Sequence, residues 1–160
     1  MKQFTTFFIG DTYFGINILQ VQEINSQTNF TPVPDSSEYI RGLLNLRGQI
    51  ITVFDMSKRL GREGINEDAK TRNLILKTDN QTEELRREGL VTSRIGNDAV
   101  GFLVDKIGDV VEVEEEDIKP APANIGEVSN EFVEGIVELD DKLLIIVNVE
   151  ELVNINNKDE

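Results

Sequence analysis

Residues Tyr39–Asp55 read Tyr-Ile-Arg-Gly-Leu-Leu-Asn-Leu-Arg-Gly-Gln-Ile-Ile-Thr-Val-Phe-Asp and hold the clearest structural pattern of the chain. Two apolar runs, Leu43–Leu46 and Ile50–Phe54, flank the dipeptide of Arg47 and Gly48. Large and β-branched residues on both sides of a short glycine-containing turn are typical of a β-hairpin. Glycine adopts positive φ without steric cost, as a tight turn often requires. The pattern therefore predicts a hairpin with Arg47 at its tip.

The composition limits the classes of partner and of chemistry. The chain has 160 residues, of which 39% are hydrophobic, enough for one domain or two small, closely packed ones. Its formal net charge of −14 argues against binding to nucleic acid or to an anionic membrane, because both are polyanions. The sequence contains no Cys and no His, which removes thiol chemistry and the commonest general base and metal ligand.

The ends of the chain and its apolar runs predict where the protein resides. The first ten residues lack the long apolar centre of a signal peptide. The longest apolar run, Leu143–Val147, is far too short to cross a bilayer. We therefore expect a cytoplasmic protein with no direct insertion into the membrane.

Alternating and apolar runs predict further strands over residues 4–9, 13–18, 73–78, 90–95, 100–104, 107–113, 132–139 and 143–149. A short helix is predicted from Asp55 to Leu60, and another begins at Glu150. Residues 79–89 are highly charged and offer little to bury, so they are expected to form an exposed loop or a frayed helical turn.

An internal repeat relates the two halves of the chain. Residues 10–24 align with residues 96–110, with glycines and apolar positions in the same phase, and after a small slip the central hairpin aligns with residues 132–147. Such agreement indicates a duplicated β-rich unit. Neither unit is large enough to be stable as a separate domain, so the two should share a core. We predict a mainly β fold of two pseudo-symmetric, five-stranded, barrel-like (SH3-like) subdomains with short helices.

The repeat also suggests boundaries for these subdomains. The first is expected at about residues 10–72 and the second at about residues 90–150, within a single domain of residues 1–160. The N-terminal strand and the C-terminal helix would pack across both. The equivalent hairpin tips differ in chemistry. In the alignment of the two repeats, Arg47 and Gly48 of the first unit correspond to Asp140 and Asp141 of the second. This difference raises the expectation that Arg47 has a function or a specific ion-pair partner.

Catalytic motifs are not evident. The 30 Asp and Glu residues are expected to be mostly solvated surface. Phosphate-binding and dinucleotide-binding glycine motifs do not occur. Asp105, Asp109 and Glu112 do not have the spacing of a calcium loop. We therefore predict a protein that is not an enzyme and holds no cofactor or metal.

At this point the motifs resemble those of the CheW family, the bacterial chemotaxis coupling proteins, over nearly the whole chain. The matching segments are Phe14-Gly-Ile, Val21-Gln-Glu-Ile24, Ile40-Arg-Gly42, Asn45-Leu-Arg-Gly48, Val53-Phe-Asp55, Val100-Gly-Phe-Leu-Val-Asp105, Ile118-Lys-Pro-Ala-Pro122 and Leu144-Ile-Ile-Val-Asn148. The resemblance implies a noncatalytic adaptor that couples transmembrane methyl-accepting chemoreceptors to the histidine kinase CheA in a signalling array. Its partners would be the regulatory domain of the kinase and the cytoplasmic tips of the receptors.

The resemblance also implies site residues. The receptor-binding positions of the family carry over to Val21, Glu23, Gly42, Asn45, Arg47 and Gly48. Glu23 and Arg47 are charges on otherwise apolar strands, and we predict that they form an ion pair. For the kinase we choose Leu43 and Ile51, from the expected exposed apolar face of the first hairpin.

The sequence departs from the family pattern in three places. Thr52 and Ser37 stand where the family commonly has proline, and the segment Asp79–Gly89 is longer than usual. Other interpretations remain open at this point: a CheW-like module of a larger coupling protein, a nucleic-acid-binding pair of small barrels, or an unrecognised hydrolase. The second would need a basic, aromatic-rich face, which 6% aromatic residues and the acidic charge do not favour.

Overall fold

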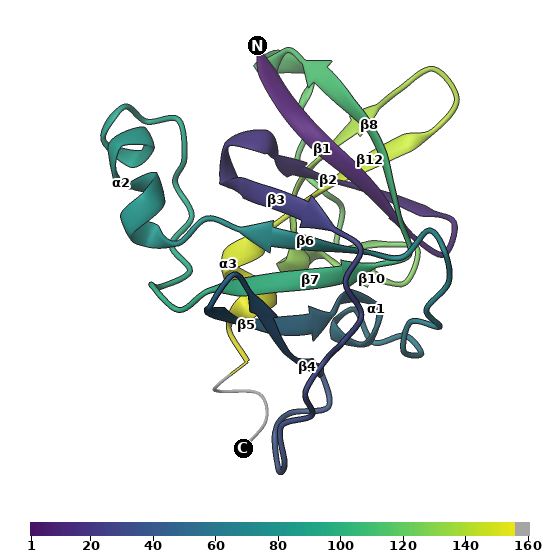
Figure 1. The fold of residues 1–160 in the computed structure, drawn as a ribbon. Coiled ribbons are helices and arrows are strands. Elements are labelled where there is room, and N and C mark those ends of the chain that lie inside the picture. The colour runs from purple at the N-terminus through teal and green to yellow at the C-terminus, as the bar shows by residue number, and fades with distance from the viewer. Residues whose placement is uncertain (156–160) are drawn as a thin grey trace.

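A computed structural model describes residues 1–155 and shows a mainly β protein (Figure 1). One five-stranded sheet has the strand order β11-β12-β2-β1-β8 and the other the order β3-β6-β7-β5-β4. The strands of the first are β1 (Lys2–Ile9), β2 (Thr12–Asn17), β8 (Lys106–Val113), β11 (Val133–Glu138) and β12 (Leu143–Val147). Those of the second are β3 (Val21–Asn25), β4 (Ile40–Leu46), β5 (Gln49–Asp55), β6 (Arg72–Leu76) and β7 (Val100–Val104). A small sheet pairs β9 (Asn124–Ile125) with β10 (Val128–Ser129).

The remaining elements are short. The α-helices are α1 (Met56–Arg59), α2 (Asp79–Arg87) and α3 (Val149–Val153), and the 3-10 turns are η1 (Ile18–Gln20), η2 (Glu115–Asp117) and η3 (Asn130–Phe132). Within residues 1–155, none of the helices has the length and apolar character needed to cross a membrane.

The two sheets have the same internal arrangement, which confirms the predicted repeat. If β1 to β5 are matched in order with β6, β7, β8, β11 and β12, the strand order of one sheet becomes that of the other. The two parallel pairings, β5 with β7 and β12 with β2, are equivalent under the same match. The duplication seen in the sequence is therefore a pseudo-two-fold symmetry of the fold.

The sheets do not follow the subdomain boundaries expected from the repeat. In each repeat the first two strands join one sheet and the next three join the other. The turn η1 carries the chain from β2 in the first sheet to β3 in the second, and the short step at Asp105 carries it back from β7 to β8. Residues 10–72 and 90–150 therefore mark repeats rather than spatial units, because each sheet combines strands of both.

The two sheets share one large apolar core. The core contains Phe7 and Phe14 from the first sheet and Leu74 and Phe102 from the second, each at most 1% exposed. Phe7 stacks on Phe14 with ring centroids 5.5 Å apart. A smaller apolar cluster lies within the first sheet around Phe4. The expectation of a common core is confirmed.

Equivalent glycines allow a preceding extended segment to lie against each hairpin. Thr31 forms an isolated β-bridge with Leu43, directly after Gly42, and the equivalent bridge joins Lys119 to Ile136, directly after Gly135. A Cβ atom on Gly42 would lie 2.8 Å from the carbonyl oxygen of Thr31. Gly42 also has φ of 151°, which L-residues rarely adopt. Both glycines therefore have packing roles.

The arm, which we define as residues 77–99 between β6 and β7, differs from the prediction. Residues 79–87 form the helix α2, and residues 90–95 form no strand, so the predicted hairpin with β7 is wrong. The helix begins with a capping box, in which Thr78 and Gln81 satisfy each other's backbone donors. The carboxylate of Asp79 accepts hydrogen bonds from the amides of Ile95 and Gly96, at 2.9 Å each. Polar contacts order the helical part of the arm, and the buried Val91 and the half-buried Ile95 add apolar contacts in the segment that follows.

Candidate protein-interaction surface

The tip of the β4–β5 hairpin is a two-residue turn, as predicted. Arg47 and Gly48 connect the paired residues Leu46 and Gln49, with φ of 52° and 86°. Positive φ at both positions is the geometry of a type I′ turn, whose twist matches that of the flanking strands. The amide of Gly48 donates to Oδ1 of Asn45 at 3.0 Å. The Arg47 side chain therefore leaves a rigid, defined piece of backbone.

The guanidinium of Arg47 forms an ion pair with the carboxylate of Glu23, which confirms the predicted pair. Glu23 lies on β3, at the opposite edge of the sheet from β4. The sheet must therefore curve until its two edges approach each other, as expected of a barrel-like sheet. The Arg47 side chain is 70% exposed and that of Glu23 is 25% exposed. An exposed pair of this kind adds little to the stability of the fold, about 0–1 kcal/mol. Its main effect is to orient the Arg47 guanidinium.

The structure separates the predicted receptor-binding residues into two groups. Glu23, Asn45, Arg47 and Gly48 meet at the hairpin tip through the ion pair and the turn hydrogen bond. Val21 and Gly42 differ from them: Val21 is half-buried against the main core, and Gly42 is buried against the segment around Thr31. Val21 and Gly42 therefore contribute to packing and not to the exposed surface at the hairpin tip.

One of the two predicted kinase-binding residues must be corrected. Ile51 is 0% exposed and belongs to the main core, so its side chain cannot touch a partner of the folded protein. Its neighbour Ile50 is 54% exposed and pairs with Asn45 on the outer face of the hairpin. Successive strand residues point to opposite faces, so a one-residue error in phase exchanges the two isoleucines. Leu43 is half-buried and lies on the outer face.

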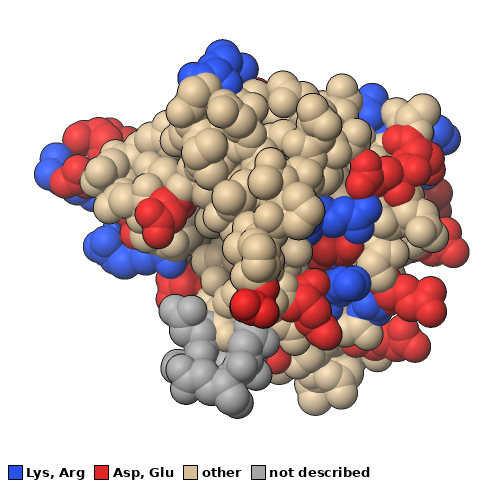
Figure 2. Space-filling view, turned by 60° about the horizontal axis from the view of Figure 1, so that its bottom comes forward, with Lys and Arg blue, Asp and Glu red and all other residues tan. Residues whose placement is uncertain are grey.

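Apolar and charged groups are segregated on this side of the molecule. Ile24 and Ile50 are large apolar side chains with 39% and 54% of their surface exposed. Figure 2 brings forward the lower side of Figure 1, where β4 and β5 lie, and shows charged groups at its two flanks with a broad uncharged band between them. An uncharged area between charged groups, next to an exposed apolar side chain such as Ile50, is typical of a protein-interaction surface.

Sequence reasoning assigned Asp55 only as a helix cap, and the structure gives it a larger part. Asp55 is 1% exposed and its carboxylate accepts hydrogen bonds from the amides of Lys58 and Ile65, at 3.1 and 3.0 Å. Arg41 pairs with the same carboxylate at 3.1 Å and with Glu67 at 2.6 Å. These contacts fix the loop after α1 to the hairpin. Only the alternation of β4, which directs Arg41 away from the core, could have suggested them.

Among the side chains of residues 1–155, there is no group of three or more acidic residues placed to hold a metal ion. The organised features of the site are a rigid turn, an ion pair and apolar side chains on the surface. The fold and this site define a duplicated β-sheet interaction domain of the scaffold class.

Comparison with known proteins gives the family. Residues 3–156 match the model of the CheW-like domain, so the chain belongs to the CheW family. It is 29% identical over 153 residues to the chemotaxis protein CheW of Klebsiella aerogenes, covering 96% of this chain and 82% of that one. It is 27% identical over 147 residues to CheW of Bacillus subtilis, covering 92% and 83%.

A solved structure agrees with this assignment. The scaffolding protein TtCheW from Thermoanaerobacter tengcongensis matches with a TM-score of 0.80 and 29% identity, covering 98% of this chain and 90% of that one. The agreement extends over both sheets, since nearly the whole chain is matched. The chain is thus a chemotaxis coupling adaptor by family and by fold.

Proposed function

We propose that this adaptor is noncatalytic and binds two partners, the cytoplasmic tip of methyl-accepting chemoreceptors and the regulatory domain of the histidine kinase CheA. The observation that carries the proposal is the ion-paired hairpin tip. Glu23 and Arg47 lie far apart in the sequence and meet on the surface. They occupy positions at which the family resemblance implies receptor contacts. The family membership does not favour the nucleic-acid-binding or hydrolase alternatives.

The receptor surface would act through preorganisation. The type I′ turn, the Asn45 side chain and the Glu23 carboxylate hold the Arg47 guanidinium before a partner arrives. A side chain that is already ordered loses less conformational entropy on binding. The guanidinium remains 70% exposed, so its other donors are accessible to acceptors on a receptor helix.

The kinase surface would lie on the outer face of the same hairpin. Leu43 and Ile50 are neighbours there, and the exposed Ile50 offers apolar area to a partner. If the two surfaces are adjacent, one adaptor can fix the kinase domain relative to the receptor tip. Receptor conformations with different contacts would then shift the population of active kinase.

A pull-down with separate receptor and kinase fragments tests the proposal. The wild-type chain should retain both fragments, and Arg47→Ala should weaken receptor retention by about tenfold or more, as expected for a central interface arginine. Lys142→Ala is the matched control, because it removes a cation from the equivalent turn of the other repeat. Ile50→Glu should weaken kinase retention instead. The proposal fails if the wild-type chain retains neither fragment.

A further inference from the structure

The pseudo-symmetry shows that the arm is an addition to one repeat. The connection between β1 and β2 is the two residues Gly10 and Asp11, whereas the equivalent connection between β6 and β7 runs from Lys77 to Ala99. The equivalent hairpin of the other repeat therefore needs only two residues at this place. The additional residues of the arm are not needed to connect β6 to β7. Their position must therefore be set by their contacts with other parts of the protein.

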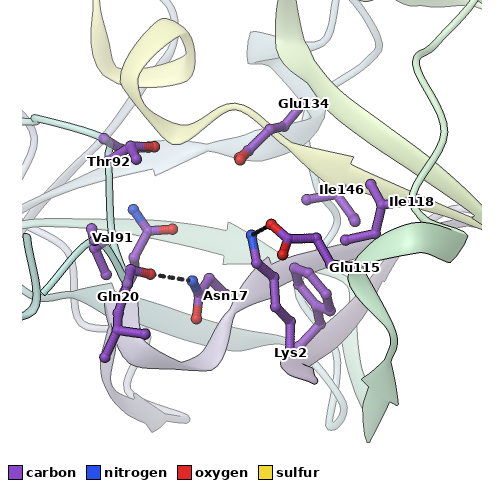
Figure 3. A pocket seen from close by; sticks show the side chains of 13 residues that line it. Lys2, Asn17, Gln20, Val91, Thr92, Glu115, Ile118, Glu134 and Ile146 are labelled. Carbon is purple, nitrogen blue, oxygen red and sulfur yellow. Dashed lines mark hydrogen bonds and ion pairs between the residues drawn. The ribbon is translucent and has the colours of Figure 1, made fainter.

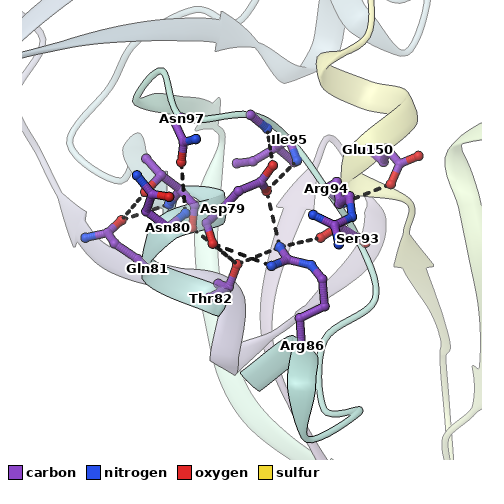
Figure 4. A network of polar contacts seen from close by, with 12 residues as sticks. Asp79, Asn80, Gln81, Thr82, Arg86, Ser93, Arg94, Ile95, Asn97 and Glu150 are labelled. Carbon is purple, nitrogen blue, oxygen red and sulfur yellow. Dashed lines mark hydrogen bonds and ion pairs between the residues drawn. The ribbon is translucent and has the colours of Figure 1, made fainter. Parts of the chain in front are cut away.

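Polar contacts hold the arm against the body of the protein (Figure 4). Within the arm, Arg86 donates to the carbonyl oxygen of Ser93 at 3.2 Å and pairs with Asp79 at 3.3 Å. The amide of Arg94 donates to the Glu150 carboxylate of α3 at 2.9 Å. These contacts fix the returning segment of the arm, residues 89–95, to α2 and to α3.

Residues 89–93 of the arm form one wall of a cavity of about 230 Å³. The facing wall comes from β1, η2, β11 and β12, and Figure 3 shows their side chains around the space. The apolar part of the lining consists of Phe4, Leu90, Val91, Ile118 and Ile146. A second hollow adjoins the cavity and shares Lys2, Asn17, Gly89, Leu90 and Glu115 with it. The space is therefore open at one side to an incoming chain.

The ionisable groups of the cavity carry an unbalanced negative charge. Lys2 is paired with Glu115 at 3.5 Å, and the Glu134 side chain has no ion pair or hydrogen bond with any described residue. Figure 3 shows the Glu134 carboxylate directed into the space between β11 and the arm. Desolvation by burial raises the pKa of Glu134, although the Lys2 ammonium opposes this shift. Glu134 is exposed at the lining of the cavity, so an incoming cation can reach its unpaired carboxylate.

We propose that this cavity binds a lysine side chain presented by a segment of a partner protein. The methylene stem would lie along the apolar lining, and the ammonium would pair with the Glu134 carboxylate. Lys2 and Glu115 neutralise each other, so one added cation balances the charge of the cavity. The net charge of −14 would draw a basic segment toward the protein at long range. This site goes beyond the adaptor function proposed above.

An NMR titration with short peptides tests the site without receptor or kinase, so it can fail independently of the adaptor function. The probe is acetyl-Leu-Lys-Leu-amide, and its control replaces lysine by norleucine, which keeps the stem and removes the charge. The lysine peptide should shift the amide resonances of residues 89–93 and of Glu134. The norleucine peptide should bind at least about tenfold more weakly, since the charge-assisted contact is lost. Equal binding of both peptides would overturn the proposal.

Variants of the protein assign the effect to the cavity. Glu134→Gln should weaken the lysine peptide by about tenfold, whereas Glu138→Gln, on the same strand but outside the lining, should leave its affinity unchanged. Thr92→Trp should fill the space from the exposed arm and abolish binding with a native spectrum otherwise. Equal weakening by Glu138→Gln would show a general charge effect and contradict the site.

Discussion

Arg47 adopts a backbone conformation that is uncommon for a residue with a long side chain. Its φ of 52° lies in the left-handed region, which the type I′ turn requires. The turn places the Arg47 side chain beside the edge strand β3, where it pairs with Glu23. Neither residue is needed for the core, since both side chains are at least partly exposed. At the residue scale, the exposure of this pair agrees with the recognition role proposed for it.

A double-mutant cycle separates recognition from stability at this pair. Glu23→Ala and Arg47→Ala should each change the free energy of unfolding by less than about 1 kcal/mol. Receptor affinity should fall in both single variants, and the double variant should lose little more than Arg47→Ala alone. Denaturant titration and calorimetry measure the two quantities. Additive losses of affinity would contradict a functional role for the pair.

Glu134 should destabilise the folded protein at neutral pH. Its pKa is raised above the ordinary value of 4.5 by burial, so between the two values the folded state binds more protons than the unfolded chain. Stability therefore falls as pH rises through this window, and the full penalty remains above it. Lys2 and Glu115 are the charged groups that face this carboxylate in the cavity.

Glu134→Gln should therefore raise the denaturation midpoint at pH about 7 and have almost no effect below the ordinary pKa of 4.5. Glu138→Gln supplies the control for the change of net charge. Denaturant midpoints at both pH values measure the difference. A gain that is the same at both pH values would show that the carboxylate is not desolvated.

At the scale of single elements, structure that depends on apolar patterns was easier to predict from the sequence than structure that depends on polar networks. The hairpin of β4 and β5 was predictable, because its apolar residues alternate and its turn contains glycine. The choice of Ile51 over Ile50 was wrong, because two adjacent isoleucines give no sign of which faces the core. The helix α2 was expected only as an exposed loop or a frayed helical turn, because Asp79 stabilises it through residues that follow it by sixteen and seventeen positions.

Asp79→Ala should loosen the arm while the sheets remain intact. The substitution removes the acceptor for two backbone amides and the partner of Arg86, at a cost of about 1–3 kcal/mol for the arm. Amide hydrogen exchange at Ile95 and Gly96 should accelerate, with slow exchange preserved in the core strands. Asp98→Ala, an exposed carboxylate of the same arm, is the control. Unchanged exchange at both amides would contradict the network.

At the scale of the whole molecule, the repeat and the spatial unit are different things. Each five-stranded sheet takes two strands from one repeat and three from the other. Such an exchange ties the two halves together more firmly than an interface between separate barrels would. The family match over residues 3–156 agrees with a single domain.

Fragments of residues 1–70 and 71–160 should therefore be unfolded when alone, because each would contain incomplete parts of both sheets. Mixed in equal amounts, they should recover the dispersed amide NMR spectrum of the intact chain. Circular dichroism and NMR of each fragment and of the mixture measure this. A fragment that folds by itself would show that its repeat is a separate subdomain.

Local sequence pattern was sufficient for most of the strands and for the hairpin turn, although the strand expected at residues 90–95 does not form, and comparison of the two halves revealed the duplication. These features depend on residue alternation, on glycine and on spacing, all of which act over a few neighbouring residues. The exchange of strands between the sheets, the folded arm and the cavity it encloses depend on contacts between residues far apart in the chain. Such contacts form only when the core closes, so no short stretch of sequence contains them.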